Sequence, residues 1–115
     1  MSSRSTAAAA EINKINLFYG LMPRLGTRWA QTRPWEGKTI AVNAHLTTLT
    51  GTLLRELALG GGKWVVSASE PATTDMGVVE WMREQGWTVY SGGGRADRHL
   101  ASLDHEPDLI ADVGF

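Results

Sequence analysis

The distribution of apolar and polar positions along the chain alternates between two periods. Short runs that are apolar on both faces occupy residues 39–42, 63–67, 87–90 and 108–111, as is typical of strands buried in a parallel sheet. Between them, apolar side chains recur every three or four residues over 53–59, 76–86 and 96–103, which predicts helices. The same spacing predicts a helix from Ala7 to near Gly20 and a shorter one over 23–31, both before the first strand.

This order of elements predicts an α/β fold. Strands that are joined by helical crossovers form a parallel sheet with right-handed connections. We therefore expect a Rossmann-like parallel sheet of about four strands flanked by helices, preceded by one or two N-terminal helices. Residues 1–6 are polar, small and terminal, and we expect them to be disordered. Residues 7–115 are expected to form a single domain.

The carboxyl ends of the predicted strands bring polar residues to one edge of the sheet. His45, Thr47 and Thr50 follow the first strand, a polar loop over 67–75 follows the second, and Asp112 closes the last. In open α/β sheets, ligands bind in the crevice outside this edge. Segments that are far apart in the sequence are therefore predicted to form one site.

The residues after the first strand have two interpretations each. His45 could donate a hydrogen bond to a ligand hydroxyl or move a proton near neutral pH, or it could cap the following helix. Thr47 and Thr50 are three residues apart and share a helix face, which suits hydrogen bonding to a heterocycle. Either threonine could instead cap the helix, so the spacing leaves both functions open.

Thr73, Thr74 and Asp75 precede an apolar helix. They form a capping sequence in which Asp75 is favourable at the positive end of the helix dipole. The same loop could also form a wall of the ligand crevice. Asp112 directly follows an apolar strand and has no helix to cap, so it is a candidate general base or an acceptor for a ribose hydroxyl.

The chain contains two runs of three glycines, at 60–62 and 92–94. The first follows a helix, and Gly60 is the residue expected to end that helix in a left-handed conformation. The second lacks the GxGxxG spacing, and the acidic residue about 20 positions later, that a dinucleotide site requires. Both runs are interpreted as turns. For the second run, a loop that touches a ligand is a minor alternative interpretation.

Composition narrows the class of partner. The chain has 11 Lys and Arg against 12 Asp and Glu, so binding to nucleic acid through bulk charge is not expected. It has no cysteine, which excludes disulfides and thiolate metal sites. No apolar run approaches the roughly 20 residues that cross a bilayer. We therefore expect a cytoplasmic protein without metal, membrane or nucleic-acid partners.

Three motifs at matching places resemble the S-adenosylhomocysteine hydrolase family. The segment at 22–54 is similar to the family's short helix and turn, followed by a strand and a His-x-Thr-x-x-Thr motif, here His45, Thr47 and Thr50. The Ala-Thr-Thr-Asp sequence at 72–75 is similar to the family's Ser-Thr-Gln-Asp. The Leu-Ile-Ala-Asp-Val-Gly-Phe sequence at 109–115 is similar to its Ile-Leu-Asp-Asp-Gly-Gly-Asp. The resemblance covers residues 22–115 and is to the amino-terminal substrate-binding region.

The resemblance implies a function for each matched position. His45, Thr47 and Thr50 would contact the adenosine part of the ligand. Asp112 would match an aspartate of the catalytic centre, and residues 73–75 would lie beside the homocysteine part and the dinucleotide. The family uses NAD to oxidise the ribose 3′-hydroxyl during the reaction. Leu49 stands where the family has Glu or Gln for the adenine edge. On this resemblance residues 7–115 form a truncated domain that lacks the family's NAD-binding domain.

These observations leave several functions open. The chain could be part of a hydrolase-like enzyme whose NAD-binding module is elsewhere. It could also be a binding module for a nucleoside-type ligand that differs from the family's. In a third interpretation it is a structural module that forms a homo-oligomer or pairs with a partner chain through an exposed sheet edge. The sequence leaves catalysis by the chain undecided.

Overall fold

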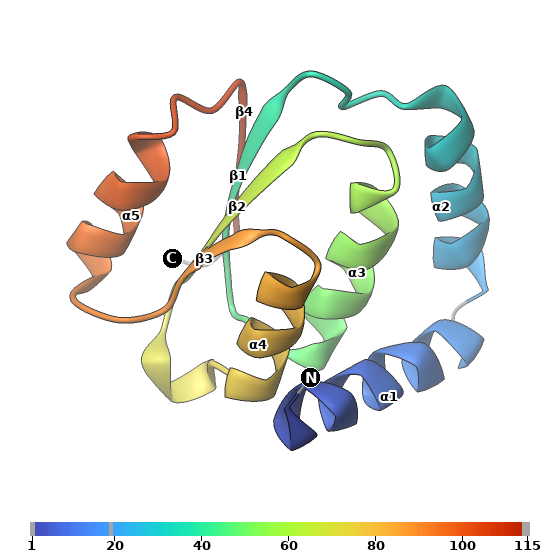
Figure 1. Ribbon diagram of the computed structural model, residues 1–115, viewed down its shortest axis with the longest axis horizontal. Helices are drawn as coiled ribbons and strands as arrows, with labels where there is room; N and C mark the ends of the chain where they lie inside the picture. Colours follow the sequence, from blue (N-terminus) through green and yellow to red (C-terminus); the bar gives the residue numbers. More distant parts are fainter. Residues whose placement is uncertain (1, 19, 114–115) are drawn as a thin grey trace.

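The computed structural model describes residues 2–18 and 20–113 of the chain (Figure 1). Its elements are, in order, α1 (Ser3–Phe18), α2 (Leu21–Thr32), β1 (Thr39–Ala44), α3 (Thr48–Ala58), β2 (Lys63–Ala68), a single 3₁₀ turn (Pro71–Thr73), α4 (Met76–Glu84), β3 (Thr88–Tyr90), α5 (Arg95–Leu103) and β4 (Leu109–Asp112). Within the described ranges, no helix has both the length and the apolar character to cross a membrane.

The strands form one sheet with the order β3-β2-β1-β4, and every pair is parallel. The predicted α/β fold, with a parallel sheet and leading helices, is therefore confirmed. The chain passes from β1 to β2 and β3 in one direction and then returns, through α5, to place β4 on the other side of β1. The direction of winding thus reverses between β1 and β4, which is where a crevice is expected in such a sheet.

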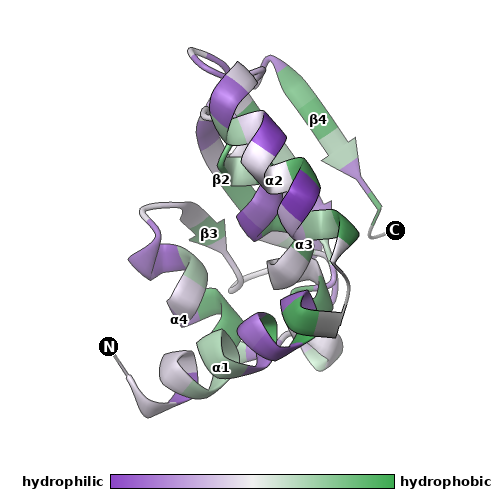
Figure 2. Ribbon diagram, turned by 90° about the vertical axis from the view of Figure 1, so that its right-hand side faces the viewer, coloured by the Kyte–Doolittle hydropathy of each residue, from purple (hydrophilic) through white to green (hydrophobic). Residues whose placement is uncertain are grey.

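Helices cover the two faces of the sheet unequally. In Figure 1, α3 and α4 lie on one side of the strands and α5 lies on the other, while α1 runs beneath α3 and α4. The core on the α3 and α4 side contains fully buried Ile12, Leu46, Val66, Val78 and Met82. All four residues of β4 are exposed, and Figure 2 shows this apolar strand standing apart from α2 and α3.

The N-terminal segment differs from the expectation of disorder. Met1 lies outside the described residues, but Ser3–Thr6 form the first turn of α1, so the expectation is wrong for these residues. Ser5 is fully buried, and its hydroxyl donates to the Glu84 carboxylate of α4 at 2.9 Å. The contact with α4 stabilises this first turn of α1, and the composition of the segment alone does not reveal such a contact.

Several boundaries also differ from those expected. Helix α2 begins at Leu21 rather than at Pro23, and β1 and β2 continue to Ala44 and Ala68 because the parallel ladder pairs these last residues. The expected left-handed conformation lies not at Gly60 but at Gly61 and Gly62, with φ of +89° and +93°. The left-handed glycine therefore comes one residue later than a cap at Gly60 would place it, although α3 itself ends at Ala58.

Glu80 of α4 forms a second connection to the N-terminal helix. Its carboxylate accepts hydrogen bonds from the Ser2 hydroxyl and the Arg4 guanidinium. The bond from Ser2, aided by the positive charge of Arg4, lowers the pKa of the Glu80 carboxyl from its ordinary value of 4.5. A carboxyl with a lowered folded-state pKa stabilises the fold above its unfolded pKa and loses this effect as the pH falls through the folded value.

We therefore expect the amino-terminal turn of α1 to loosen as the pH falls below 4.5. Hydrogen exchange of the amides in this turn, corrected for the intrinsic pH dependence of exchange, measures the effect. In the Glu80→Gln variant the amides should be less protected at neutral pH and should show a smaller pH dependence. Equal pH dependence in both proteins would contradict the role of Glu80.

Gly77 allows α1 and α4 to approach each other closely. A Cβ at this position would lie 2.5 Å from the backbone oxygen of Arg4. Alanine normally favours a helix over glycine by about 1 kcal/mol, but here the colliding atom is backbone. We expect Gly77→Ala to reduce the free energy of unfolding by about 1–3 kcal/mol, measured by denaturant titration.

Gly20→Ala is the matched control for this substitution. Gly20 has a negative φ of −59°, and a Cβ there would meet nothing within 4 Å. This variant should be neutral or slightly more stable than the parent. An equally stable Gly77→Ala protein would show that α1 can move away from α4 at no cost.

Candidate functional site

The loops that follow β1 and β2 are held together at the carboxyl edge of the sheet. The Asp75 amide donates to the Leu46 carbonyl at 2.9 Å, and the Ser69 amide donates to the Ala44 carbonyl at 3.0 Å. The side chains of His45 and Thr73 meet directly, with 2.6 Å between Nδ1 and Oγ1. The structure thus brings together residues from two of the predicted site segments.

The contact between His45 and Thr73 fixes the position of the imidazole. The Thr73 hydroxyl has a single proton, and the Glu70 carbonyl lies within hydrogen-bond distance of it at 3.2 Å. Thr73 either donates this proton to the carbonyl and accepts from Nδ1–H of the ring, or donates it to Nδ1. In the first case Nε2 of neutral His45 is an acceptor, and in the second case it is a donor.

The threonines of the His-x-Thr-x-x-Thr motif make local hydrogen bonds. Thr47 caps α3, because its hydroxyl oxygen accepts from the Thr50 amide at 3.3 Å. The Thr50 hydroxyl donates to the His45 carbonyl at 2.6 Å. Both side chains therefore fix the turn that carries His45.

The remaining predicted residues of the second loop act in the same way. Thr74 donates its hydroxyl proton to the Glu70 carbonyl at 2.7 Å. The Asp75 carboxylate caps α4 by accepting from the amides of Gly77 and Val78 at 2.8 and 3.3 Å. The helix-capping interpretation of Asp75 is thus observed, and its carboxylate also brings negative charge to this side of the edge.

Asp112 belongs to a second group of polar residues, on the α5 side of the sheet. Its carboxylate accepts from the side-chain amide of Asn43 at 2.8 Å, and the amide oxygen of Asn43 accepts from the Ser67 hydroxyl at 3.2 Å. These three residues, the polar ladder, occupy adjacent positions on β2, β1 and β4. Asn43 and Ser67 are buried, and each lies one position before the last residue of its strand.

Arg98 of α5 is a further residue of the edge that the sequence pattern did not single out. Its side chain is buried, with 3% of the residue exposed. The guanidinium donates to the Ala68 carbonyl at 2.7 Å and to the Gly93 carbonyl at 2.6 Å. Arg98 therefore joins the end of β2 to the glycine loop after β3 and places a positive charge near the edge.

The glycine loop at 92–94 does not fit a dinucleotide. The sequence at 92–97, Gly-Gly-Gly-Arg-Ala-Asp, lacks the GxGxxG spacing of such a site. Only Gly93 has a positive φ, of +72°, which a turn explains. The described residues also contain no group of three or more His, Asp and Glu side chains arranged to hold a metal.

The predicted residues therefore form two groups that meet at the end of β1. Thr50 lines an apolar cavity of about 270 Å³ on the α3 side, together with Ala44, Leu53 and Val113. Asp112 and Asn43 line a smaller cavity of about 230 Å³ under α5. His45 directly follows β1 and lines neither of these two cavities.

Comparison with known proteins relates the chain to a class of hydrolases that act on nucleoside thioethers of homocysteine. It is 33% identical over 101 residues to the S-inosyl-L-homocysteine hydrolase of Methanopyrus kandleri, covering 81% of this chain and 24% of that protein. It is 28% identical over 109 residues to the adenosylhomocysteinase of Thermotoga maritima, covering 90% of this chain and 27% of that enzyme. No protein-family model matches the chain.

The predicted resemblance to S-adenosylhomocysteine hydrolases is therefore confirmed. The adenosylhomocysteinase of Pyrobaculum aerophilum adds 35% identity over 92 residues, 76% of this chain and 21% of that enzyme. The chain is thus related to one region of these hydrolases and spans about a quarter of the length of the curated relatives it matches.

Proposed function

We propose that the chain binds a purine nucleoside, or its thioether with homocysteine, in the crevice at the carboxyl edge of the sheet. The observation that carries this proposal is that His45 follows β1 and Asp112 ends β4, the two strands between which the winding reverses. A nucleoside offers hydroxyl and amine groups for hydrogen bonds with both side chains. The relatedness to adenosylhomocysteinases and S-inosyl-L-homocysteine hydrolases supports the same class of ligand.

The predicted residues have different roles in this proposal. His45 and Asp112 contact the ligand, while Thr47 and Thr50 position His45 through the turn that they stabilise. Thr73 holds the imidazole, and Thr74 and Asp75 shape the adjacent wall. Hydrolysis with NAD, as the resemblance implies, needs a dinucleotide site, and the glycine run at 92–94 lacks the GxGxxG spacing of one, so we propose binding for this chain and no step of catalysis.

Leu49 determines how the purine is recognised in this proposal. Its side chain is 64% exposed and lines an apolar groove with Leu21, Met22 and Leu53. A leucine offers no hydrogen bond to the edge of a base, so the purine would be held here by apolar contact. Adenine and hypoxanthine differ mainly in the polar groups of that edge, so discrimination between them should be weak at this position.

Calorimetric titration of the chain with adenosine, inosine, S-adenosylhomocysteine and S-inosylhomocysteine tests the proposal. We expect saturable binding without added NAD, and affinities for the adenine and hypoxanthine ligands within about tenfold of each other. Leu49→Glu should restore a preference between the two bases. No saturable binding by any of the four compounds would remove the proposed function.

A second candidate function is self-association or association with a partner chain through β4. Ile110 and Val113 are 62% and 70% exposed, and β4 is an edge strand of the sheet. An exposed apolar edge strand is a template for pairing with another chain. Sedimentation velocity with and without Ile110→Lys tests this candidate, and a monomer at all concentrations in both proteins would exclude self-association.

A further inference from the structure

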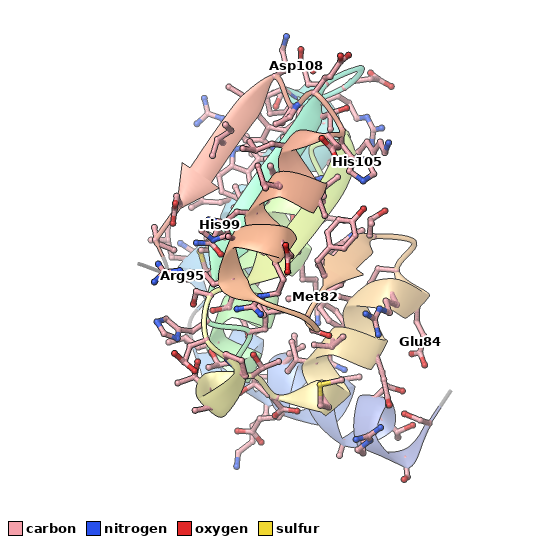
Figure 3. All side chains as sticks on the ribbon, turned by 90° about the vertical axis from the view of Figure 1, so that its left-hand side faces the viewer. Met82, Glu84, Arg95, His99, His105 and Asp108 are labelled. Carbon is pink, nitrogen blue, oxygen red and sulfur yellow. The ribbon has the colours of Figure 1, made fainter. Side chains whose placement is uncertain are left out.

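The cavity under α5 contains a buried nitrogen that has no partner. Residues from three elements line it, and its polar members are Asn43, His99, Ser102 and Asp112. Within the described part of the chain, Nε2 of His99 is buried and has no hydrogen-bond partner. Figure 3 shows His99 on the side of α5 that faces β4. Buried polar atoms in folded proteins are almost always hydrogen-bonded, so an unpaired one beside a cavity indicates that a polar group enters there.

The other polar groups of the cavity already have internal partners. Ser102 donates its hydroxyl proton to the His99 carbonyl at 2.8 Å, and both ends of the Asn43 amide are used within the polar ladder. A ligand in the cavity would therefore meet Nε2 of His99 and the Asp112 carboxylate, which can accept more than one hydrogen bond. Ala41, Leu103 and Ile110 complete the lining, and Leu103 and Ile110 are also exposed to solvent.

A hydroxyl group matches this pair of partners. It can donate its proton to the Asp112 carboxylate while its oxygen accepts from the Nε2–H of His99. A carboxylate or phosphate would instead face the negative charge of Asp112. The volume of about 230 Å³ is larger than a single water needs and holds a hydroxylated fragment such as part of a sugar ring.

We propose that this cavity binds a sugar hydroxyl of the nucleoside between His99 and Asp112, so that His99 is a specificity-determining residue for the ribose. This inference rests on the proposed function, because it assigns one part of the same ligand. No motif of the sequence marks His99, which lies on a helix with polar neighbours. The cavity connects it to the carboxyl edge through Asp112.

The test measures affinity for adenosine, 2′-deoxyadenosine and 3′-deoxyadenosine with the parent chain and with His99→Leu and His99→Gln. One deoxynucleoside should bind the parent about tenfold more weakly than adenosine. The His99→Leu variant should bind adenosine more weakly than the parent does, by a similar factor. It should bind that deoxynucleoside with the same affinity as the parent. His99→Gln should recover part of the loss, because its amide can donate to the hydroxyl. His105→Gln, beyond the far end of α5, is the matched control and should bind as the parent does.

Two outcomes separate this inference from the proposed function. The hydroxyl site would be overturned, while nucleoside binding stands, if the affinity losses from His99→Leu and from the missing hydroxyl were additive. It would also be overturned if neither change lowered the affinity. A parent chain that binds no nucleoside would overturn both. As a readout that does not depend on a folded variant, the ring ¹⁵N shift of Nε2 in the parent should move with adenosine and not with the weaker deoxynucleoside. An unmoved shift at saturation would contradict the contact.

Discussion

Replacing His45 and Asp112 together by alanine is expected to abolish nucleoside binding while the fold outside β4 remains intact. Each residue provides a hydrogen-bond partner on a different side of the crevice, and loss of a partner for a buried ligand group costs about 1–3 kcal/mol. The two losses together correspond to a fall in affinity of at least about 30-fold. Calorimetric titration measures this fall, and far-ultraviolet circular dichroism with thermal unfolding verifies the fold.

A double variant of the same residue types at the opposite end of α5 provides the control. His105→Ala with Asp104→Ala removes an imidazole and a carboxylate that lie outside the crevice, where His105 contacts Tyr90 at 2.7 Å. The control should bind with the parent affinity. If the site variant also keeps its affinity, the carboxyl edge is not the binding site, and the exposed strand β4 becomes the more important surface.

The second large effect is expected from Arg98→Met. The substitution keeps the apolar volume of the side chain but removes the donors to the carbonyls of Ala68 and Gly93. Each carbonyl left without a partner costs about 1–3 kcal/mol, so the free energy of unfolding should fall by about 2–5 kcal/mol. Because Arg98 joins the loop after β3 to the end of β2, hydrogen exchange should increase first at residues 91–94.

Arg28→Met is the matched control for charge and size. Arg28 lies on the exposed surface of α2, so its replacement should change stability by less than about 0.5 kcal/mol. Chemical denaturation of both variants measures the difference. A loss no larger for Arg98→Met than for Arg28→Met would show that Arg98 does not hold the edge together.

The sequence predicted the sheet because the strands have a strong local signal. Residues 39–44 and 63–68 are apolar and bounded by turns, so their type and parallel pairing follow from pattern and crossover length. The order of strands and the return of β4 to the side of β1 are tertiary properties. The ordered turn at Ser3–Thr6 depends on contact with α4 and was not predictable from its own composition.

Only some residues of the candidate site were predictable from the sequence. Residues at strand ends, such as His45 and Asp112, could be found because topology alone places them at one edge. Asn43 and Ser67 sit inside the strands, and only the register reveals that they form a ladder with Asp112. Arg98 and His99 lie on a polar helix whose pattern does not distinguish a buried side chain from an exposed one, so only their packing identifies them.

The exposure of β4 affects the energetics of ligand binding. All of its residues are exposed, so the ladder to β1 and the Asn43–Asp112 bond hold the strand with little help from burial. We expect its amides to exchange by local opening at a free energy well below that of global unfolding. A ligand that contacts Asp112 binds only the closed form, so part of its binding energy orders β4 and the measured affinity is lower than the contacts alone provide. Hydrogen exchange with and without adenosine measures this: β4 should gain more protection than β2.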